Sequence, residues 1–193
     1  MAGLAAAGWL VADGMEQRRP PTPGAVERMV STGTPGVATR SLGPAEPTRI
    51  RIQRIGVDAP VVGVGLDGQG HLASPSDTDR NLAGWYRDGV APGQPGTALV
   101  LGHVDTGQGP AVFWKLGALH RGDLIDLTRS DQRAAHFAVD AVEVYAKSGF
   151  PDDKVYGQTA DAQLRLITCG GGFSKAHGYD GNVVVYAHLA AAD

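Results

Sequence analysis

The sequence has little of several things that common functions require. Its 193 residues contain one cysteine, 6% aromatic residues and 19% charged residues, and the formal net charge is -3. A single cysteine cannot form a disulfide within the chain, so it is either an inert core residue or a reactive thiol. Nucleic-acid binders usually carry a basic surface, and single-strand binders add aromatic platforms. The composition therefore argues against nucleic acid as a partner.

Long helical patterns are also missing. No stretch shows a sustained apolar spacing of about 3.6 residues, whereas glycine (28 residues) and proline (12 residues) are abundant. This composition is typical of short strands joined by tight turns. The chain is long enough for one compact domain with a buried core, plus a tail.

The N-terminal part lacks the pattern of a folded domain. Residues 1–12 are apolar and uncharged, but as a helix they would reach about 18 Å, short of the roughly 30 Å core of a bilayer. We interpret them as the remnant of a truncated membrane anchor, with a short unstructured tail as the alternative. Residues 13–47 are rich in proline and glycine without an apolar period, which predicts an extended linker. The folded domain is therefore expected at residues 48–193.

Eight short segments of this domain have the alternating or compact apolar pattern of β-strands. Turn signals separate them, as in an all-β sandwich or barrel. A short helical turn is expected within residues 111–119. The predicted strands cover residues 49–53, 59–64, 83–86, 97–102, 124–128, 134–145, 163–169 and 182–188.

Two of these strands end in a residue that can take part in nucleophilic catalysis. An apolar strand delivers His103 at its end, and another delivers Cys169 in front of three glycines. Strand ends hold a side chain still at the surface, and glycines let a substrate come close. An imidazole can favour a thiolate, take its proton and later protonate a leaving amine. Cys169 and His103 are therefore the candidate nucleophile and acid–base.

Arg165 is the third candidate, because residues two apart share one face of a strand. Arg165, Ile167 and Cys169 would then line the same side, and an arginine or a backbone N–H can stabilise an oxyanion. Each candidate has a structural alternative: a salt-bridged surface arginine, a satisfied core histidine or a buried cysteine. The remaining histidines are weaker partners for the thiol, and they are His71, His120, His136, His177 and His188.

Several blocks in a fixed order resemble the sortase family, and within it the class F sortases of actinobacteria. The resemblance runs over residues 48–189, and a histidine that precedes a Thr-Cys strand end is its main feature. The most specific blocks are Gly-His-Val-Asp at 102–105 and Leu-Arg-Leu-Ile-Thr-Cys-Gly-Gly at 164–171. The other blocks lie at 84–86, 92–97, 109–113, 116–123 and 182–187.

This resemblance implies a closed eight-stranded β-barrel with short helical turns, on an enzyme tethered outside a Gram-positive membrane by an N-terminal anchor. Such enzymes cut sorting signals of surface proteins, similar to Leu-Pro-x-Thr-Gly, between Thr and Gly. Cys169 would attack the Thr carbonyl to form a thioacyl enzyme, while His103 would protonate the leaving amine and deprotonate the incoming one. The incoming amine would belong to a peptidoglycan precursor or a pilin lysine. This chemistry needs no metal or cofactor.

One position departs from the family pattern. Many sortases carry an essential arginine near the start of the final strand, where this chain has Asn182, and no arginine follows Arg165. Either Arg165 supplies the positive charge from the cysteine strand, which we favour from the sequence, or Asn182 donates a neutral hydrogen bond.

Two other kinds of cysteine enzyme and a non-catalytic binding domain are alternatives to a sortase. L,D-transpeptidases typically present a Ser-His-Gly-Cys segment where this chain has Ile-Thr-Cys-Gly, and papain-like hydrolases place the cysteine before the histidine, the reverse of the order here. A non-catalytic β-barrel that binds at the cell surface would carry a buried, unreactive cysteine. The exposure of Cys169 therefore separates that binding domain from an enzyme.

Overall fold

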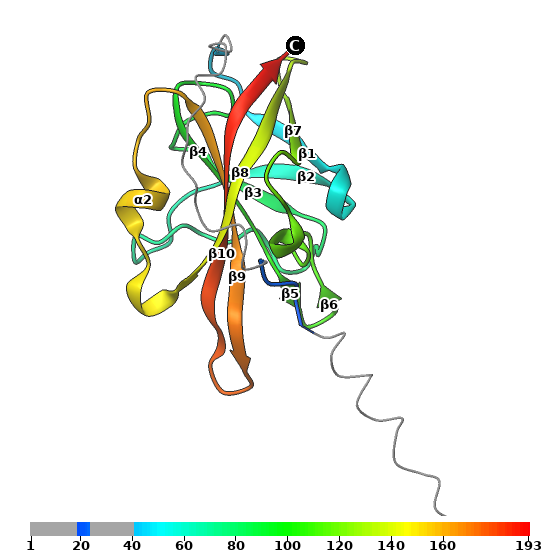
Figure 1. The fold of residues 1–193 in the computed structure, drawn as a ribbon, viewed down its shortest axis with the longest axis vertical. Coiled ribbons are helices and arrows are strands. Elements are labelled where there is room, and N and C mark those ends of the chain that lie inside the picture. Colours follow the sequence, from blue (N-terminus) through cyan, green and yellow to red (C-terminus); the bar gives the residue numbers. More distant parts are fainter. Residues whose placement is uncertain (1–18, 24–40) are drawn as a thin grey trace, which may run out of the picture.

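Eight strands form a closed barrel in the computed structural model, which describes residues 19–23 and 41–193 (Figure 1). Around the barrel the strands follow the order β1-β2-β3-β4-β9-β10-β8-β7. This arrangement confirms the predicted all-β fold. The strands are β1 Pro47–Ile52, β2 Val57–Val64, β3 Ala83–Tyr86, β4 Gly96–Gly102, β7 Leu124–Arg129, β8 Ala134–Ala146, β9 Ala162–Ser174 and β10 Gly178–Ala192.

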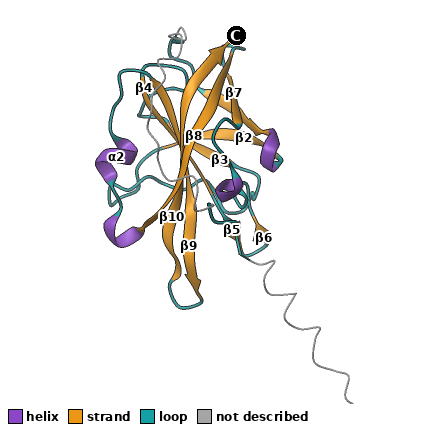
Figure 2. Ribbon diagram, in the orientation of Figure 1, coloured by secondary structure: helices purple, strands orange, loops and turns teal. Residues whose placement is uncertain are grey.

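Short elements connect the barrel strands (Figure 2). A two-stranded ribbon, β5 Asp105–Thr106 and β6 Gly109–Pro110, follows β4. The expected helical turn within residues 111–119 is present as the 3₁₀ turn η2, Leu116–Ala118. The other helical segments are η1 Gln53–Ile55, η3 Lys147–Gly149 and α2 Asp152–Tyr156.

The predicted anchor remnant, residues 1–12, lies outside the described residues. Within residues 19–23 and 41–193, no helix is both long enough and apolar enough to cross a membrane.

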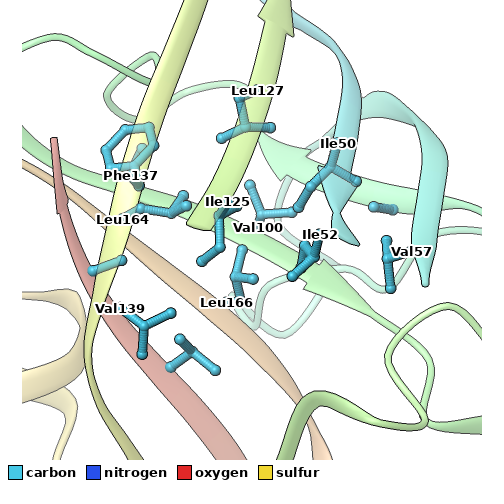
Figure 3. Close-up of a cluster of buried hydrophobic side chains, with 14 of the residues drawn as sticks. Ile50, Ile52, Val57, Val100, Ile125, Leu127, Phe137, Val139, Leu164 and Leu166 are labelled. Carbon is cyan, nitrogen blue, oxygen red and sulfur yellow. The ribbon is translucent and has the colours of Figure 1, made fainter. Parts of the chain in front are cut away.

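Aliphatic side chains fill the barrel (Figure 3). Each contributes about 1.5–3 kcal/mol when fully buried. On β4 and β9 the even-numbered residues point inward, so the odd-numbered residues of both strands face outward. This alternation decides which side chains reach the outer surface beside Cys169. Inward-pointing residues include Ile50, Ile52, Val100, Ile125, Leu127, Phe137, Leu164 and Leu166.

The two strands that carry the candidate residues lie side by side. β4 and β9 pair in parallel, from Gly96 opposite Ala162 to Leu101 opposite Ile167. Because parallel strands run in the same direction, the residues that follow the end of β4 lie beside the part of β9 that continues past Ile167. The fold thus brings together two segments that lie far apart in the sequence.

The β9–β10 hairpin extends further than the sequence predicted and projects from the barrel (Figure 1). The prediction ended β9 at Cys169 because glycine weakens a strand. In the structure β9 continues through the glycines, and the register with β10 shifts between Tyr179 and Gly181. Gly171 has a φ of 84°, and the Gly172 N–H donates to Asp180 Oδ1 at 2.7 Å. A β-bulge therefore lies at Gly171 and Gly172, opposite Asp180 and two residues after Cys169.

Candidate active site

Cys169 is an exposed thiol on the outer face of β9. Its neighbour Thr168 is 4% exposed and donates from Oγ1 to the Gly102 carbonyl at 2.7 Å. The backbone around Cys169 is thus fixed in place, while the sulfur atom of Cys169 faces solvent. Exposure of this kind fits a reactive thiol and does not fit the alternative of a buried structural cysteine.

His103 follows β4 directly and lies beside Cys169 by register. The last paired residues of the two strands are Leu101 and Ile167. If this alignment continues for two more residues, His103 lies next to Cys169. Both have odd numbers, and the odd-numbered residues of these strands face outward. The structure therefore brings the predicted nucleophile and the predicted acid–base to one site on the outer surface.

Backbone groups hold the His103 residue. Its Nε2 lies 2.8 Å from the carbonyl oxygen of Pro75, a buried residue before β3. A carbonyl oxygen only accepts, so this bond assigns the proton to Nε2 and leaves Nδ1 as the atom that can gain or lose a proton. The Phe113 N–H donates to the His103 carbonyl at 3.0 Å. A Cβ on Gly102 would lie 2.5 Å from Phe113 Cδ2, so this packing requires the glycine.

Arg165 shares the outer face of β9 with Cys169, but its guanidinium points toward the start of the strand. Nη2 donates to Gln163 Oε1 at 2.8 Å and Nη1 donates to the Leu164 carbonyl at 3.1 Å. The guanidinium carbon lies 4.5 Å from the centroid of the Tyr186 ring. Arg165 is 5% exposed, and this burial lowers the pKa of its guanidinium.

Cys169 lies four residues further along β9 than Arg165, a distance of about 13 Å at the usual rise of a strand. The structure therefore does not bring the predicted arginine to the thiol. Asn182, the second candidate for this role, lies directly opposite Cys169 on β10 and is half-buried. Directly opposed residues have Cβ atoms about 5 Å apart, so the Asn182 amide is within reach of a group bound to the sulfur.

Three further residues at the site were given no role from the sequence. The Tyr179 hydroxyl donates to Asp105 Oδ2 at 2.6 Å, which links β10 to the segment after His103. Asp105 belongs to the Gly-His-Val-Asp block at residues 102–105, but nothing in the sequence indicated a role for its carboxylate. Pro75 gave no signal at all, because its backbone carbonyl, rather than its side chain, contacts His103.

A second, smaller apolar cluster lies on the outer face of the barrel beside Cys169. Ile167 and Val184, the outward neighbours of Cys169 and Asn182, are buried there against Val155 of α2. We call this cluster, with the partly exposed rings around it, the apolar ledge. The rings belong to Tyr145, Phe150, Tyr156 and Tyr186.

Two of the weaker histidine candidates are bound to aspartates elsewhere on the barrel. His136 Nδ1 lies 2.6 Å from Asp126 Oδ1, and His188 Nδ1 lies 2.7 Å from Asp140 Oδ1. Neither is aligned with Cys169 as His103 is. Across the described part of the chain, no group of three or more His, Cys, Asp or Glu side chains could hold a metal ion.

Comparison with known proteins finds a matching domain family and similar folds. A model of the sortase domain matches residues 50–190. A sortase A from Listeria monocytogenes is 19% identical, with a TM-score of 0.58 over 78% of this chain and 90% of that one. The SrtA sortase of Actinomyces oris is also 19% identical, with a TM-score of 0.58 over 84% and 89%. A sortase D5 transpeptidase from Clostridium perfringens is 21% identical, with a TM-score of 0.54 over 78% and 81%. None of the curated proteins matches this chain in sequence.

Proposed function

This chain belongs to the sortase family of transpeptidases, and on that premise we propose that it cleaves sorting signals similar to Leu-Pro-x-Thr-Gly between Thr and Gly. The observation that carries the proposal is an exposed Cys169 aligned with His103 at the shared edge of β4 and β9. A thiol and an imidazole on one rigid surface are the two groups that acyl transfer through a thioester requires.

The first half of the reaction forms the thioacyl enzyme. The thiolate of Cys169 attacks the carbonyl carbon of the substrate Thr and forms a C–S bond. The C–N bond then breaks, and the departing glycine amine takes a proton from His103. Because Nε2 is held by the Pro75 carbonyl, we assign this proton transfer to Nδ1.

The second half releases the product. An incoming amine attacks the thioester carbon and gives a proton to the neutral Nδ1 of His103. The C–S bond breaks and the Cys169 thiolate is restored, so atoms and charge balance over the cycle. We propose that the amine belongs to a peptidoglycan precursor or to a pilin lysine.

Each tetrahedral intermediate carries an oxyanion beside Cys169 that needs a hydrogen-bond donor. The place of Asn182 directly across from Cys169 supports its amide in this role. The sequence favoured Arg165, whose guanidinium is held by Gln163 and Leu164. A role for Arg165 stays a prediction, and the two residues are tested against each other below.

The apolar ledge supports a peptide substrate with hydrophobic residues before its cleavage site. Its centre at Ile167, two residues before Cys169 on β9, is buried against Val155 of α2, and the rings around that centre are partly exposed. We propose that the Leu and Pro of the sorting signal pack against these rings while the Thr carbonyl reaches the sulfur. Rings such as those of Tyr145 and Tyr186 offer large apolar contact area for such side chains.

We also propose a class and a location for this enzyme. The order of the sequence blocks supports a class F sortase. Sortases are typically associated with the cell surface, and we propose that this enzyme works on the extracytoplasmic face of the membrane, held by an N-terminal anchor of which residues 1–12 are a remnant.

The direct test is incubation with a Leu-Pro-x-Thr-Gly peptide followed by intact-mass spectrometry. We expect a thioacyl adduct on the wild type that an added amine removes, and no adduct on Cys169→Ala. An adduct of equal size on Cys169→Ala, or no adduct on the folded wild type, would refute the proposal.

A further inference from the structure

We propose that Tyr179 and Asp105 form a clasp that positions His103 against Cys169, an inference that rests on the proposed function. The clasp is the hydrogen bond from the Tyr179 hydroxyl to Asp105 Oδ2, 2.6 Å long. Asp105 lies two residues after His103, and Tyr179 lies on β10 directly before the bulge that faces the glycines after Cys169. The bond therefore joins the histidine segment to the cysteine hairpin.

The clasp is one of two ties that flank the catalytic pair. The other is the bond from Thr168 Oγ1 to the Gly102 carbonyl, 2.7 Å long, between the residues that directly precede Cys169 and His103. The Thr168 bond joins the middle of β9 to the end of β4, just before the catalytic pair, and the clasp lies just after the pair. His103 and Cys169 are thus bracketed on both sides by hydroxyl groups that bridge their two segments.

The surroundings of Tyr179 favour a bond that persists at neutral pH. Burial raises the pKa of the phenol, and the hydrogen bond to Asp105 and the nearby Cys169 add to this effect. The hydroxyl therefore keeps the proton that it donates. The Tyr179 ring also packs against Phe173, with 5.0 Å between centroids, which fixes the ring on the hairpin.

The hairpin and the β5–β6 ribbon need this connection because both lie beyond the paired part of the barrel. The pairing of β4 with β9 ends at Leu101 and Ile167, before either catalytic residue. Without the clasp, the segment after His103 and the bulge after Cys169 can separate. A displacement of about 1 Å between reacting groups can cost about 100-fold in rate.

The test measures cleavage and thiol reactivity in parallel on the full chain. We expect Tyr179→Phe to lower kcat by about 10- to 100-fold with KM within about twofold, because the clasp aligns reacting groups without holding the peptide. Iodoacetamide alkylation of Cys169, followed by intact mass across pH 5 to 10, needs no peptide. We expect Tyr179→Phe to move this profile in the same direction as His103→Ala does.

Two matched sets of variants separate positioning from folding. Asp105→Asn keeps an accepting oxygen and should remain closer to wild type than Asp105→Ala, in both kcat and the alkylation profile. Tyr86→Phe removes the hydroxyl of another half-buried tyrosine, at the far end of β3, and should leave both measurements unchanged. Thermal unfolding confirms that each variant is folded.

The outcomes are distinguishable from those of the proposed function. If Tyr179→Phe folds and leaves both kcat and the alkylation profile unchanged, the clasp has no positioning role. If the wild type cleaves no sorting peptide but Tyr179→Phe still shifts the alkylation profile as His103→Ala does, the substrate assignment is wrong and the clasp stands.

Discussion

Asn182 and Arg165 differ in what they can offer an oxyanion at Cys169. Asn182 has its amide across from the sulfur, whereas Arg165 is buried four residues away and bonded to Gln163. Loss of one oxyanion donor typically costs about 100- to 1,000-fold. We therefore expect Asn182→Ala to lower kcat/KM for peptide cleavage by about 100-fold, measured under single-turnover conditions.

Arg165→Met provides the comparison, because methionine preserves most of the apolar contact with Tyr186. We expect a folded Arg165→Met to keep kcat/KM within about fivefold of wild type, since the removed charge does not touch the reacting atoms. The reverse pattern, with Arg165→Met inactive and Asn182→Ala active, would restore the role that the sequence suggested for the arginine.

His136 gives the protein a pH-dependent contribution to stability. Hydrogen bonds from its ring to Asp126 and then Asp193 raise the pKa of the imidazole in the folded state. A raised folded pKa means that the stabilisation is complete below the unfolded pKa of about 6.5 and is lost as pH rises through the folded value. We expect His136→Gln to lower the free energy of unfolding at pH 5.5 by up to about 1 kcal/mol, and by less at pH 8.5.

Urea unfolding of the wild type and His136→Gln at both pH values measures this difference. His188→Gln is a useful comparison, because His188 pairs with one aspartate, Asp140, instead of two. A larger loss for His136→Gln at pH 8.5 than at pH 5.5 would contradict the proposed sign.

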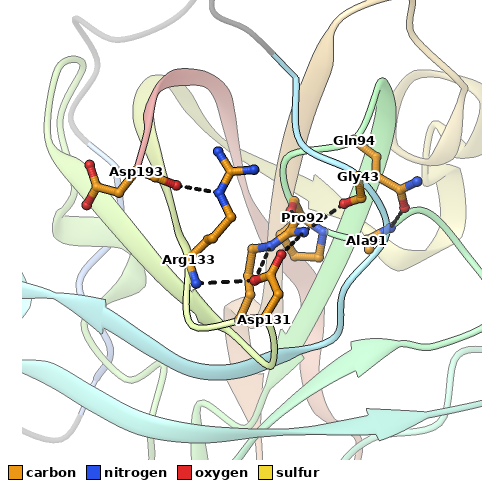
Figure 4. A network of polar contacts seen from close by, with 8 residues as sticks. Gly43, Ala91, Pro92, Gln94, Asp131, Arg133 and Asp193 are labelled. Atoms are coloured by element: carbon orange, nitrogen blue, oxygen red, sulfur yellow. Dashed lines mark hydrogen bonds and ion pairs between the residues drawn. The ribbon is translucent and has the colours of Figure 1, made fainter.

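Arg129, at the end of β7, ties two loops to the barrel. Its side chain is 0% exposed, and it donates to the carbonyls of Gly43 and Pro92 and to Asp131 (Figure 4). Arg129→Met fills similar volume but removes the donor from both carbonyls, of which that of Pro92 is buried and that of Gly43 belongs to an exposed residue. Since one unsatisfied buried group costs about 1–3 kcal/mol, we expect the free energy of unfolding to fall by about 2 kcal/mol, as measured by urea titration.

Arg133→Met is the matched control, because Arg133 lies in the same turn region but is exposed and donates to the Asp193 carbonyl. Substitutions at such surface positions usually change stability by less than about 0.5 kcal/mol. Equal losses of stability for the two variants would show that the buried Pro92 carbonyl does not depend on Arg129.

Strands were the part of the fold that local sequence could reveal. Alternation of apolar residues located β1, β7 and β8 because one face of each strand fills the barrel. The end of β9 was placed too early, since its continuation through Gly170–Gly172 depends on pairing with β10 and on the bulge at Asp180. Such pairing is a tertiary effect that overrides the local preference of glycine.

Barrel closure explains why the candidate site was only partly predictable. The alternation of side chains along a strand predicted that Arg165 and Cys169 share one face of β9, and they do. It could not predict in which direction along the strand the long Arg165 side chain extends. The parallel contact of β4 with β9 joins residues more than 60 positions apart, and no local pattern reports it. Residue identity therefore suggested Cys169 and His103, whereas Asp105, Tyr179 and Pro75 emerged only from the closed barrel.

The described residues 19–23 (blue in Figure 1) lie against the barrel at η2. A Cβ on Gly117 would lie 2.1 Å from the carbonyl oxygen of Pro21, closer than any real contact. We therefore expect Gly117→Ala to displace this segment and to lower Tm by about 2–4 °C, the shift for about 1 kcal/mol in a chain of this size. Calorimetry of the full chain and of a chain that lacks residues 1–23, each with and without Gly117→Ala, measures the effect. The substitution should leave the shortened chain unchanged, and an equal loss of Tm in both chains would show that the added methyl clashes with the barrel instead.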